Sequence, residues 1–202
     1  MRLKYKTFLL KMSAVLFLAA PAAADESVLY DQAPPKDAVF VRLLADNAKT
    51  DFRFNGRVLQ RPPGTDTAYA AISAKTLGNS EAGTFYSLLE DRNGNLVSIE
   101  EPKDRPNSKV HLFLINADEA PVQLIVPDRE IKVVEATAQF EIGSRSVNPV
   151  QTPLAVQLAD DRTIIDTFDL SLNRGQNITF LVQNGKITVI ENRFGPVIEP
   201  AG

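Results

Sequence analysis

A long series of short apolar segments constrains the fold of this chain more than any other feature. After residue 24 these segments are rich in β-branched and aromatic residues, and Asn, Asp, Gly or Pro residues separate them. Such segments are typical of β-strands, and a helical repeat of apolar residues is nearly absent. In Val122, Leu124 and Val126 the apolar positions alternate with Gln123, which indicates one buried face and one wetter face. The sequence therefore predicts an all-β protein of antiparallel β-sandwiches.

Two parts of the chain resemble each other and indicate two tandem domains. Thr84-Phe85 leads to Asn93-Gly94 and a further strand, and Thr179-Phe180 leads in the same way to Asn184-Gly185. Asn-Gly between apolar runs is typical of a type I′ hairpin turn. The segments 39–47 and 110–118 correspond as well, which favours a duplication. The alternative is that two β domains each end in a common hairpin.

The domain boundaries follow from the prolines and the dense charge between the two similar parts. Pro102 and Pro106 flank charged residues that can neither continue a strand ladder nor build a core, so we expect a short, stiff linker there. Residues 143–149 are expected to form a loop. The predicted organisation is a signal peptide at 1–24, an N-terminal arm at 25–37, a first β-sandwich domain at 38–101, a linker at 102–108, a second β-sandwich domain at 109–195 and a C-terminal tail at 196–202.

The N-terminus has the pattern of an export signal. Four basic residues precede the apolar run 12–20, and the small residues 22–24 precede an acidic pair, which predicts cleavage after Ala24. A membrane anchor is the alternative, but the uncharged stretch is shorter than the about 20 residues that a spanning helix needs. We therefore expect a periplasmic protein with no membrane span after cleavage.

The net charge and the cysteine content limit which partners the protein can bind and which covalent bonds can stabilise or anchor it. Cleavage removes four of the 22 basic residues and no acid, so 18 Lys and Arg oppose 25 Asp and Glu, a formal charge of −7. This balance disfavours nucleic acid as a partner. The chain has no Cys, which excludes disulfides and a lipidated cysteine anchor.

No pattern in the sequence indicates a catalytic, metal or cofactor site. With no Cys and one His, a zinc site is not available, and no strand is followed by a Gly-rich phosphate loop. An esterase-like or acyltransferase-like reaction would need His111 as the base for a Ser, but no Gly-x-Ser-x-Gly turn accompanies it. We therefore predict a non-catalytic protein without cofactor or metal.

The aromatic content bears on sugar binding. Carbohydrate-binding sandwiches stack sugars on exposed rings, whereas this chain has no Trp and few Tyr, and most Phe residues occupy alternating strand positions that indicate a core. A carbohydrate-binding module remains the alternative function.

The segment before the first expected strand is the candidate partner-binding site. It combines an apolar and aromatic cluster with a double proline that stiffens the backbone. Aromatic and Arg side chains are common anchors in protein interfaces. The residues assigned to partner binding are Tyr30, Pro35, Lys36 and Arg42; the alternative is that this arm packs on its own sheet.

An ordered set of short matches resembles the AlgF family of periplasmic alginate O-acetylation proteins. The matches comprise Leu29-Tyr30, Pro35-Lys36, Phe40-Val41-Arg42, Leu96-Val97, Glu100-Glu101-Pro102, Asn148-Pro149-Val150, the strand 154–158 and Leu172-Asn173-Arg174-Gly175. The middle of the first domain, residues 46–82, departs from this pattern.

The resemblance implies an accessory protein that mediates protein–protein contacts during O-acetylation of an exopolysaccharide, alginate or alginate-like. The implied partners are a periplasmic polysaccharide O-acetyltransferase and a membrane-bound acyl-transfer protein, with the exopolysaccharide itself as a further candidate. The alternative is a non-catalytic carbohydrate-binding β-sandwich module that acts on the exported polymer.

Overall fold

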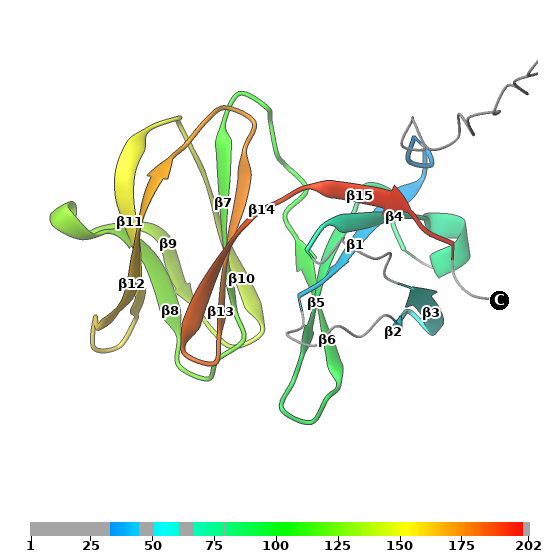
Figure 1. Cartoon of the computed structure of the whole chain (residues 1–202), viewed down its shortest axis with the longest axis horizontal. Helices are drawn as coiled ribbons and strands as arrows, with labels where there is room; N and C mark the ends of the chain where they lie inside the picture. Colours follow the sequence, from blue (N-terminus) through cyan, green and yellow to red (C-terminus); the bar gives the residue numbers. More distant parts are fainter. Residues whose placement is uncertain (1–32, 45–50, 61–66, 79, 200–202) are drawn as a thin grey trace, which may run out of the picture. The chain divides into compact units, whose positions relative to one another are not determined.

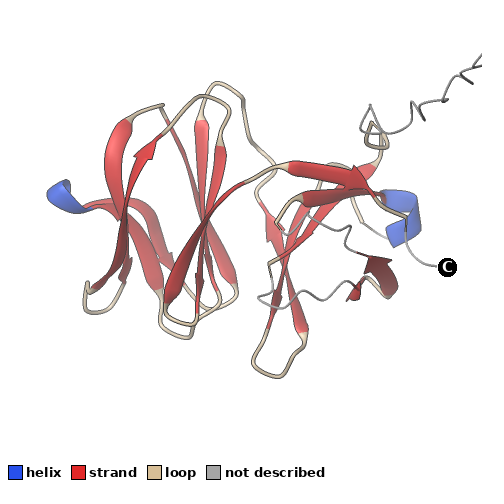
Figure 2. Cartoon of the chain, viewed as in Figure 1, coloured by secondary structure: helices blue, strands red, loops and turns tan. Residues whose placement is uncertain are grey.

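The computed structural model describes residues 33–44, 51–60, 67–78 and 80–199 (Figure 1). The expected signal peptide and most of the expected arm, with Tyr30, lie outside these residues. Within the described ranges, strands dominate, and the two helices, η2 and η3, are short 3-10 helices (Figure 2). The all-β expectation is confirmed. The elements in chain order are β1 (Ala38–Leu43), β2 (Asp51–Phe54), β3 (Arg57–Gln60), β4 (Tyr69–Ser73), η2 (Ala74–Leu77), β5 (Phe85–Glu90), β6 (Leu96–Glu101), β7 (Val110–Asn116), β8 (Val122–Val126), η3 (Pro127–Arg129), β9 (Ile131–Thr137), β10 (Glu141–Val147), β11 (Gln151–Leu158), β12 (Ile164–Ser171), β13 (Asn177–Gln183), β14 (Lys186–Glu191) and β15 (Phe194–Val197).

The first half is built on one five-stranded sheet with the order β15-β4-β1-β5-β6. One face of this sheet carries Val39, Val41 and Leu43 from β1, because successive side chains of a strand point to opposite faces. The separate β2–β3 hairpin contributes Phe52, Phe54 and Leu59 to the same core. This face is therefore buried under the hairpin, and the other face of β1 carries Phe40 and Arg42.

The second half is a sandwich of two four-stranded sheets, with the orders β10-β7-β13-β14 and β12-β11-β8-β9. Its core takes alternate residues of both sheets, such as Leu112 and Leu114 of β7, Phe180 of β13 and Leu154 and Val156 of β11. The core positions follow the alternation of the sequence, but Gln123, on the face expected to be wetter, is buried as well.

The internal resemblance corresponds to a shared four-strand unit. In β4-β1-β5-β6 and in β10-β7-β13-β14, the first strand of the half lies second in order, antiparallel to one neighbour and parallel to the other. In both units the last two strands form a hairpin. Asn184 and Gly185 have φ of +54° and +70°, the left-handed conformation that a type I′ turn requires.

Three features differ from the expectations. The pairs β1–β5, β7–β13 and β4–β15 are parallel, in sheets that are otherwise antiparallel. Residues 143–147 of the stretch 143–149, which is expected to be a loop, belong to β10 (Glu141–Val147), an edge strand that pairs with all of β7. Its Gly and Ser residues lack an apolar alternation because much of this edge is exposed.

The last strand, β15, returns to pair with β4 of the first sheet, and its Gly195 and Pro196 suit an edge strand.

The two halves share a third apolar cluster. Leu44, Leu89 and Ile99 of the first half contact Ile115, Leu181 and Ile190 of the second. The free face of the first sheet therefore packs at this end on the β7–β13–β14 sheet. Within the described residues, no helix is long and apolar enough to cross a membrane.

Candidate functional site

A buried ion pair lies at the centre of the free face of the first sheet. The side chains of Arg42 on β1 and Glu101 at the end of β6 are both 0% exposed, and Arg42 Nη2 lies 3.0 Å from Glu101 Oε1. Arg42 Nε donates to Ser87 Oγ at 2.7 Å, and Ser87 Oγ donates to Glu101 Oε1 at 2.5 Å. The Arg42 guanidinium also stacks on the Tyr69 ring, 4.5 Å from its centroid. The pair therefore spans β1 and β6, and Ser87 bridges it from β5, the strand between them.

The same guanidinium joins the two halves of the chain. Arg42 Nη1 donates to Asn192 Oδ1 at 2.7 Å, and Arg42 Nη2 donates to Thr179 Oγ1 at 3.0 Å. Thr179 in turn donates to Asn192 Oδ1, and Asn192 Nδ2 donates to Tyr69 Oη at 3.3 Å. Arg42 therefore holds β13 and the segment before β15 against the first sheet.

Glu101 stays ionised because its partners outweigh its burial. Burial alone would raise the pKa of Glu101, but the charges of Arg42 and Arg105 and the hydrogen bonds from Ser87 and Tyr69 lower it below its ordinary value of 4.5. Arg105 Nη2 lies 2.9 Å from Glu101 Oε2, and Tyr69 Oη donates to the same oxygen at 2.7 Å. Burial raises the pKa of Tyr69, so this phenol remains a donor. The network therefore carries a net positive charge, because two guanidinium groups face one carboxylate.

An aromatic surface, which we define as Phe40, Phe85 and Phe194, adjoins this network. The rings of Phe40 and Phe85 stack at 4.7 Å, and Phe194 meets Phe40 edge-on at 5.1 Å. Phe194 is 67% exposed, a large value for a Phe that contacts other rings. Arg105 lies over the Phe85 ring at 3.9 Å from its centroid. An exposed aromatic ring beside half-buried rings and an Arg side chain is a composition typical of the energetic centre of a protein interface.

The structure separates the predicted partner-binding residues. Lys36 is exposed and Pro35 is partly exposed, directly before β1, and the Pro35 carbonyl accepts a hydrogen bond from Ala38 N at 2.9 Å. Arg42 is buried with its donors engaged inside the chain, so it is not presented to a partner in this structure. Tyr30 lies outside the described residues.

Sequence reasoning missed the residues that complete this face. Phe194 lies in the expected second domain, and Arg105 lies in the expected linker, yet both are brought to the first sheet. A Phe-Gly-Pro sequence at the end of a chain, which suits a short edge strand, is the one signal that could have marked Phe194.

The single histidine is held inside the second half. His111 is buried, its Nε2 lies 3.0 Å from the Pro106 carbonyl oxygen, and its Nδ1 lies 2.9 Å from Ser146 Oγ. A carbonyl oxygen can only accept, so Nε2 carries the proton and Nδ1 accepts from the Ser146 hydroxyl. Ser146 itself is exposed on the edge strand β10. The contact therefore pairs an exposed hydroxyl with a potential base.

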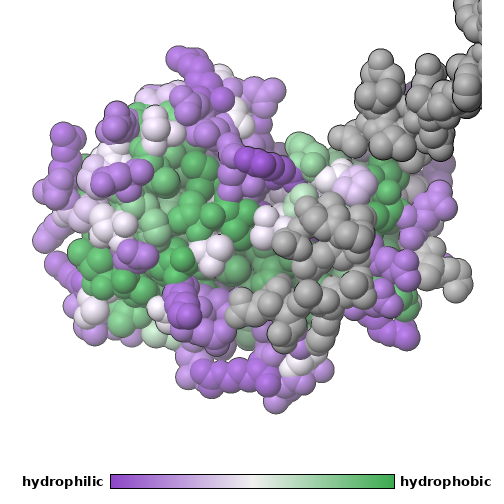
Figure 3. Space-filling view, in the orientation of Figure 1, coloured by the Kyte–Doolittle hydropathy of each residue, from purple (hydrophilic) through white to green (hydrophobic). Residues whose placement is uncertain are grey.

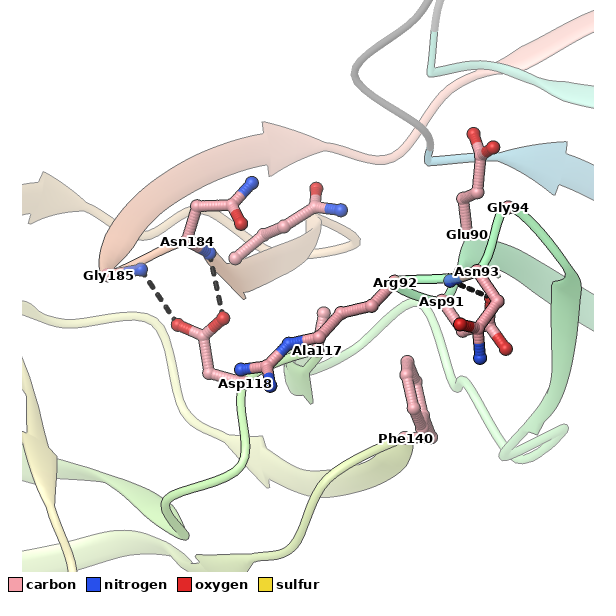
Figure 4. A pocket seen from close by; sticks show the side chains of 11 residues that line it. Glu90, Asp91, Arg92, Asn93, Gly94, Ala117, Asp118, Phe140, Asn184 and Gly185 are labelled. Carbon is pink, nitrogen blue, oxygen red and sulfur yellow. Dashed lines mark hydrogen bonds between the residues drawn. The ribbon is translucent and has the colours of Figure 1, made fainter.

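A polar groove of about 770 Å³ lies among the turns β5–β6, β7–β8 and β13–β14 (Figure 4). Asp118 accepts from the backbone N–H groups of Asn184 and Gly185, both at 2.8 Å. Arg92 extends across the groove in Figure 4 and pairs with Glu119 at 2.6 Å. The lining includes Glu90, Asp91 and Asp118 against one Arg, so the groove does not favour a polyanion.

Polar side chains cover the tip of the β5–β6 hairpin at the bottom of Figure 3, while hydrophobic surface shows among polar groups on the second half. In the part of the chain that the structure describes, no group of three or more His, Asp or Glu residues is placed to hold a metal ion.

The fold and this face define an all-β protein in which two strand-built halves are joined through a buried charged network with an aromatic surface beside it. Comparison with known proteins assigns it more narrowly. The family model described as "Alginate O-acetyl transferase AlgF" matches residues 13–179, and the chain belongs to the AlgF family.

Relatives named "Alginate biosynthesis protein AlgF" match most of the chain. The protein from Azotobacter vinelandii is 26% identical over 187 residues, which cover 87% of this chain and 83% of the relative. The protein from Pseudomonas syringae pv. tomato is 27% identical over 172 residues, covering 79% and 77%, and that from Pseudomonas aeruginosa is 25% identical over 187 residues, covering 85% and 86%. A solved C-terminal domain of AlgF from P. aeruginosa matches with 20% identity and a TM-score of 0.34, over 46% of this chain and 99% of that domain.

Proposed function

We propose that this chain is a periplasmic accessory protein that mediates protein–protein contacts in the O-acetylation of alginate or an alginate-like exopolysaccharide. Its partners are a periplasmic polysaccharide O-acetyltransferase and a membrane-bound acyl-transfer protein. Family membership and the names of the relatives support the pathway. The observation that carries the docking role is the aromatic surface, in which the 67% exposed Phe194 lies against Phe40, beside Arg105.

A role in docking suits this surface better than a role in binding the polymer. The rings of Phe40 and Phe85 stack on each other, and Arg105 covers one face of Phe85, so these two rings are largely engaged within the chain. The polar groove carries an excess of carboxylates, which would repel a uronate chain. Tyr30, Pro35 and Lys36 precede β1, whose Phe40 belongs to the surface, and we propose that they extend it.

The test is the ester-bound acetyl content and the total yield of polymer secreted by the source bacterium, with this gene deleted and restored. We expect loss of acetyl groups while polymer is still made. Restoration with Phe194→Ala should leave the acetyl content low at normal protein level. Val150→Ala, which trims an exposed apolar residue of the second half, is the matched control and should restore acetylation. Unchanged acetyl content after deletion would refute the proposal and favour a sugar-binding module.

The contact between Ser146 and His111 favours a second candidate function, acyl transfer through a Ser nucleophile. His111 Nδ1 is the acceptor for the Ser146 hydroxyl, and the Pro106 carbonyl orients the ring as the third member of a catalytic triad would. Against it, Ser146 lies on a sheet edge, and the described residues place no helix N-terminus beside it as an oxyanion site.

Purified mature protein distinguishes the two candidates. Release or transfer of acetyl from an activated ester, lost in both Ser146→Ala and His111→Gln, would support the enzyme. If the protein is an accessory protein, the wild type should show no turnover above that of the Ser146→Ala variant. A folded His111→Gln variant should still restore acetylation in the deletion strain.

A further inference from the structure

A polar row crosses three neighbouring strands of the β10-β7-β13-β14 sheet. Ser146 of β10 and Asn177 of β13 are both register partners of His111 on β7. The alternate residues Leu112 and Ile178 point into the sandwich core, so the three polar side chains lie on the opposite face of the sheet. A hydroxyl, an imidazole and a carboxamide therefore follow one another across this face.

The carboxamide oxygen of Asn177 is buried and has no hydrogen-bond partner. Among the side-chain atoms that the structure describes, only Thr84 Oγ1 shares this property. Asn177 Nδ2 donates to the Gly175 carbonyl oxygen at 3.2 Å, and because that oxygen can only accept, the NH2 end of the amide faces it and Oδ1 remains unpaired. Buried polar atoms are normally paired, so this acceptor on the strand next to His111 requires an explanation. A free acceptor in this place can stabilise a positive charge on the neighbouring ring.

The His111 ring is placed to take a proton and to return it. Its Nδ1 accepts from the Ser146 hydroxyl at 2.9 Å, and its Nε2 lies 3.0 Å from the Pro106 carbonyl oxygen. When Nδ1 takes the Ser146 proton, the ring carries two N–H groups and a positive charge. The Pro106 carbonyl is one neutral acceptor for this imidazolium, and the polar row supplies the Asn177 oxygen as a second one.

Ser146 has this base, whereas its neighbour Ser144 does not. Both serines are exposed on β10, and they point to the same face because they are two residues apart. The register partner of Ser144 is Phe113, and that of Ser146 is His111. The strand β10 pairs with β7 alone in its sheet, so the Ser146 hydroxyl lies on an open edge that a reagent can approach.

We propose that Ser146, His111 and Asn177 form a covalent acyl-acceptor site, which takes an acetyl group from an activated ester and holds it. Ser146 Oγ attacks the acyl carbon while its proton passes to His111 Nδ1, so the Oγ–C bond forms and the C–S or C–O bond to the leaving group breaks. The proton then passes from Nδ1 to the leaving sulfur or oxygen. Asn177 is a positioning residue, which acts through the charge of the ring. The described residues place no helix N-terminus beside Ser146, so the donor must be an activated ester.

This inference rests on the second candidate of the proposed function and deepens it, because it adds a third side chain to that site and names the class of donor. Under the docking role alone, Ser146 stays a free hydroxyl. The aromatic surface belongs to the first sheet, so the two proposals concern separate parts of the chain.

The test is acetylation of the purified protein by p-nitrophenyl acetate, an oxygen ester, and by acetyl-coenzyme A, a thioester. Peptide mass spectrometry locates the acetyl group, and hydroxylamine, which cleaves esters and not amides, separates it from acetyl-lysine. We expect a single acetyl ester on Ser146, formed at least tenfold more slowly in His111→Gln. Ser144→Ala is the matched control and should react like the wild type. Reaction with either ester supports the site and identifies the class of donor. Absence of acetyl from Ser146 with both esters, or equal labelling of Ser144 and Ser146, would overturn the proposal.

Two variants of Asn177 separate the role of its oxygen from a role in the fold. Asn177→Asp keeps the oxygen, Asn177→Leu removes it, and both lose the donation to Gly175. Acetylation of Ser146 should be at least threefold slower in Asn177→Leu and no slower than the wild type in Asn177→Asp. Equal slowing in both variants would overturn the role of Asn177. These readouts do not use the secreted polymer, so full acetylation of the polymer with Phe194→Ala would refute the docking proposal and leave this one standing.

Discussion

Replacement of Glu101 by Gln tests whether the buried charge network holds the two halves of the chain together. Glu101 is the only carboxylate that Arg42 reaches among the described residues, and both side chains are fully buried. Gln keeps the size and can still accept hydrogen bonds, but it leaves the charge of Arg42 unbalanced in the protein interior. The removal of one partner of a buried pair costs about 3–5 kcal/mol.

The structure also predicts an order of effects. Arg42→Met should cost less than Glu101→Gln, because Glu101 keeps Arg105 at 2.9 Å and the donors Ser87 and Tyr69. The double variant Arg42→Met with Glu101→Gln should cost less than the sum of the single variants by about 1 kcal/mol or more, since the two side chains interact directly.

Urea denaturation followed by circular dichroism measures these costs, and thermal unfolding should show a midpoint lower by roughly 6–20 °C for Glu101→Gln. Arg42 joins the two halves through Thr179 and Asn192, so the loss of its counterion should weaken this junction too. One half should therefore unfold in a separate, earlier transition in Glu101→Gln. Arg92→Gln is the control: its ion pair with Glu119 is exposed, and no measurable change is expected. A loss below 1 kcal/mol for Glu101→Gln, or additive single effects, would refute the reasoning.

Three further predictions concern the same regions. Acid should unfold the wild type partly through Glu101, because the pKa of this carboxyl is lowered in the folded state. The stability that its charge contributes is present above the ordinary pKa of 4.5 and is lost as the pH falls below it. The free energy of unfolding should therefore depend less on pH in Glu101→Gln. Gly143→Ala should destabilise by about 1–3 kcal/mol in urea, because an added Cβ would overlap the Val134 side chain and lie 2.6 Å from Thr137 Oγ1; a loss under 0.5 kcal/mol would contradict this packing. Phe194→Ala should change the unfolding free energy by less than about 1 kcal/mol while weakening partner binding, and a large loss of stability would assign Phe194 to the fold instead.

The sequence was sufficient for the fold class and for most strands because alternation and turn residues act locally. The hairpin at Asn184-Gly185 is an example, since its two left-handed residues and the apolar runs beside it specify the turn without the rest of the chain. The parallel pair β1–β5 was not foreseen, because parallel partners are far apart in sequence and the same apolar pattern serves either direction. The sequence predicts a loop over residues 143–149, but residues 143–147 belong to the edge strand β10, because an exposed edge strand needs no apolar period.

The residue Arg42 shows why the site was harder to predict than the fold. The sequence predicts Arg42 as a partner-binding residue because Arg side chains are common interface anchors, but the structure buries it. Its partner Glu101 lies at the end of β6, Arg105 lies in the segment expected to be a linker, and Asn192 lies beyond β14. Strands β1 and β6 of one sheet bring Arg42 and Glu101 together, and the return of the chain to this sheet at β15 adds Asn192. The same return places Phe194 beside Phe40, so the buried network and the exposed aromatic surface depend on one chain path, and a change that frees β15 should weaken both.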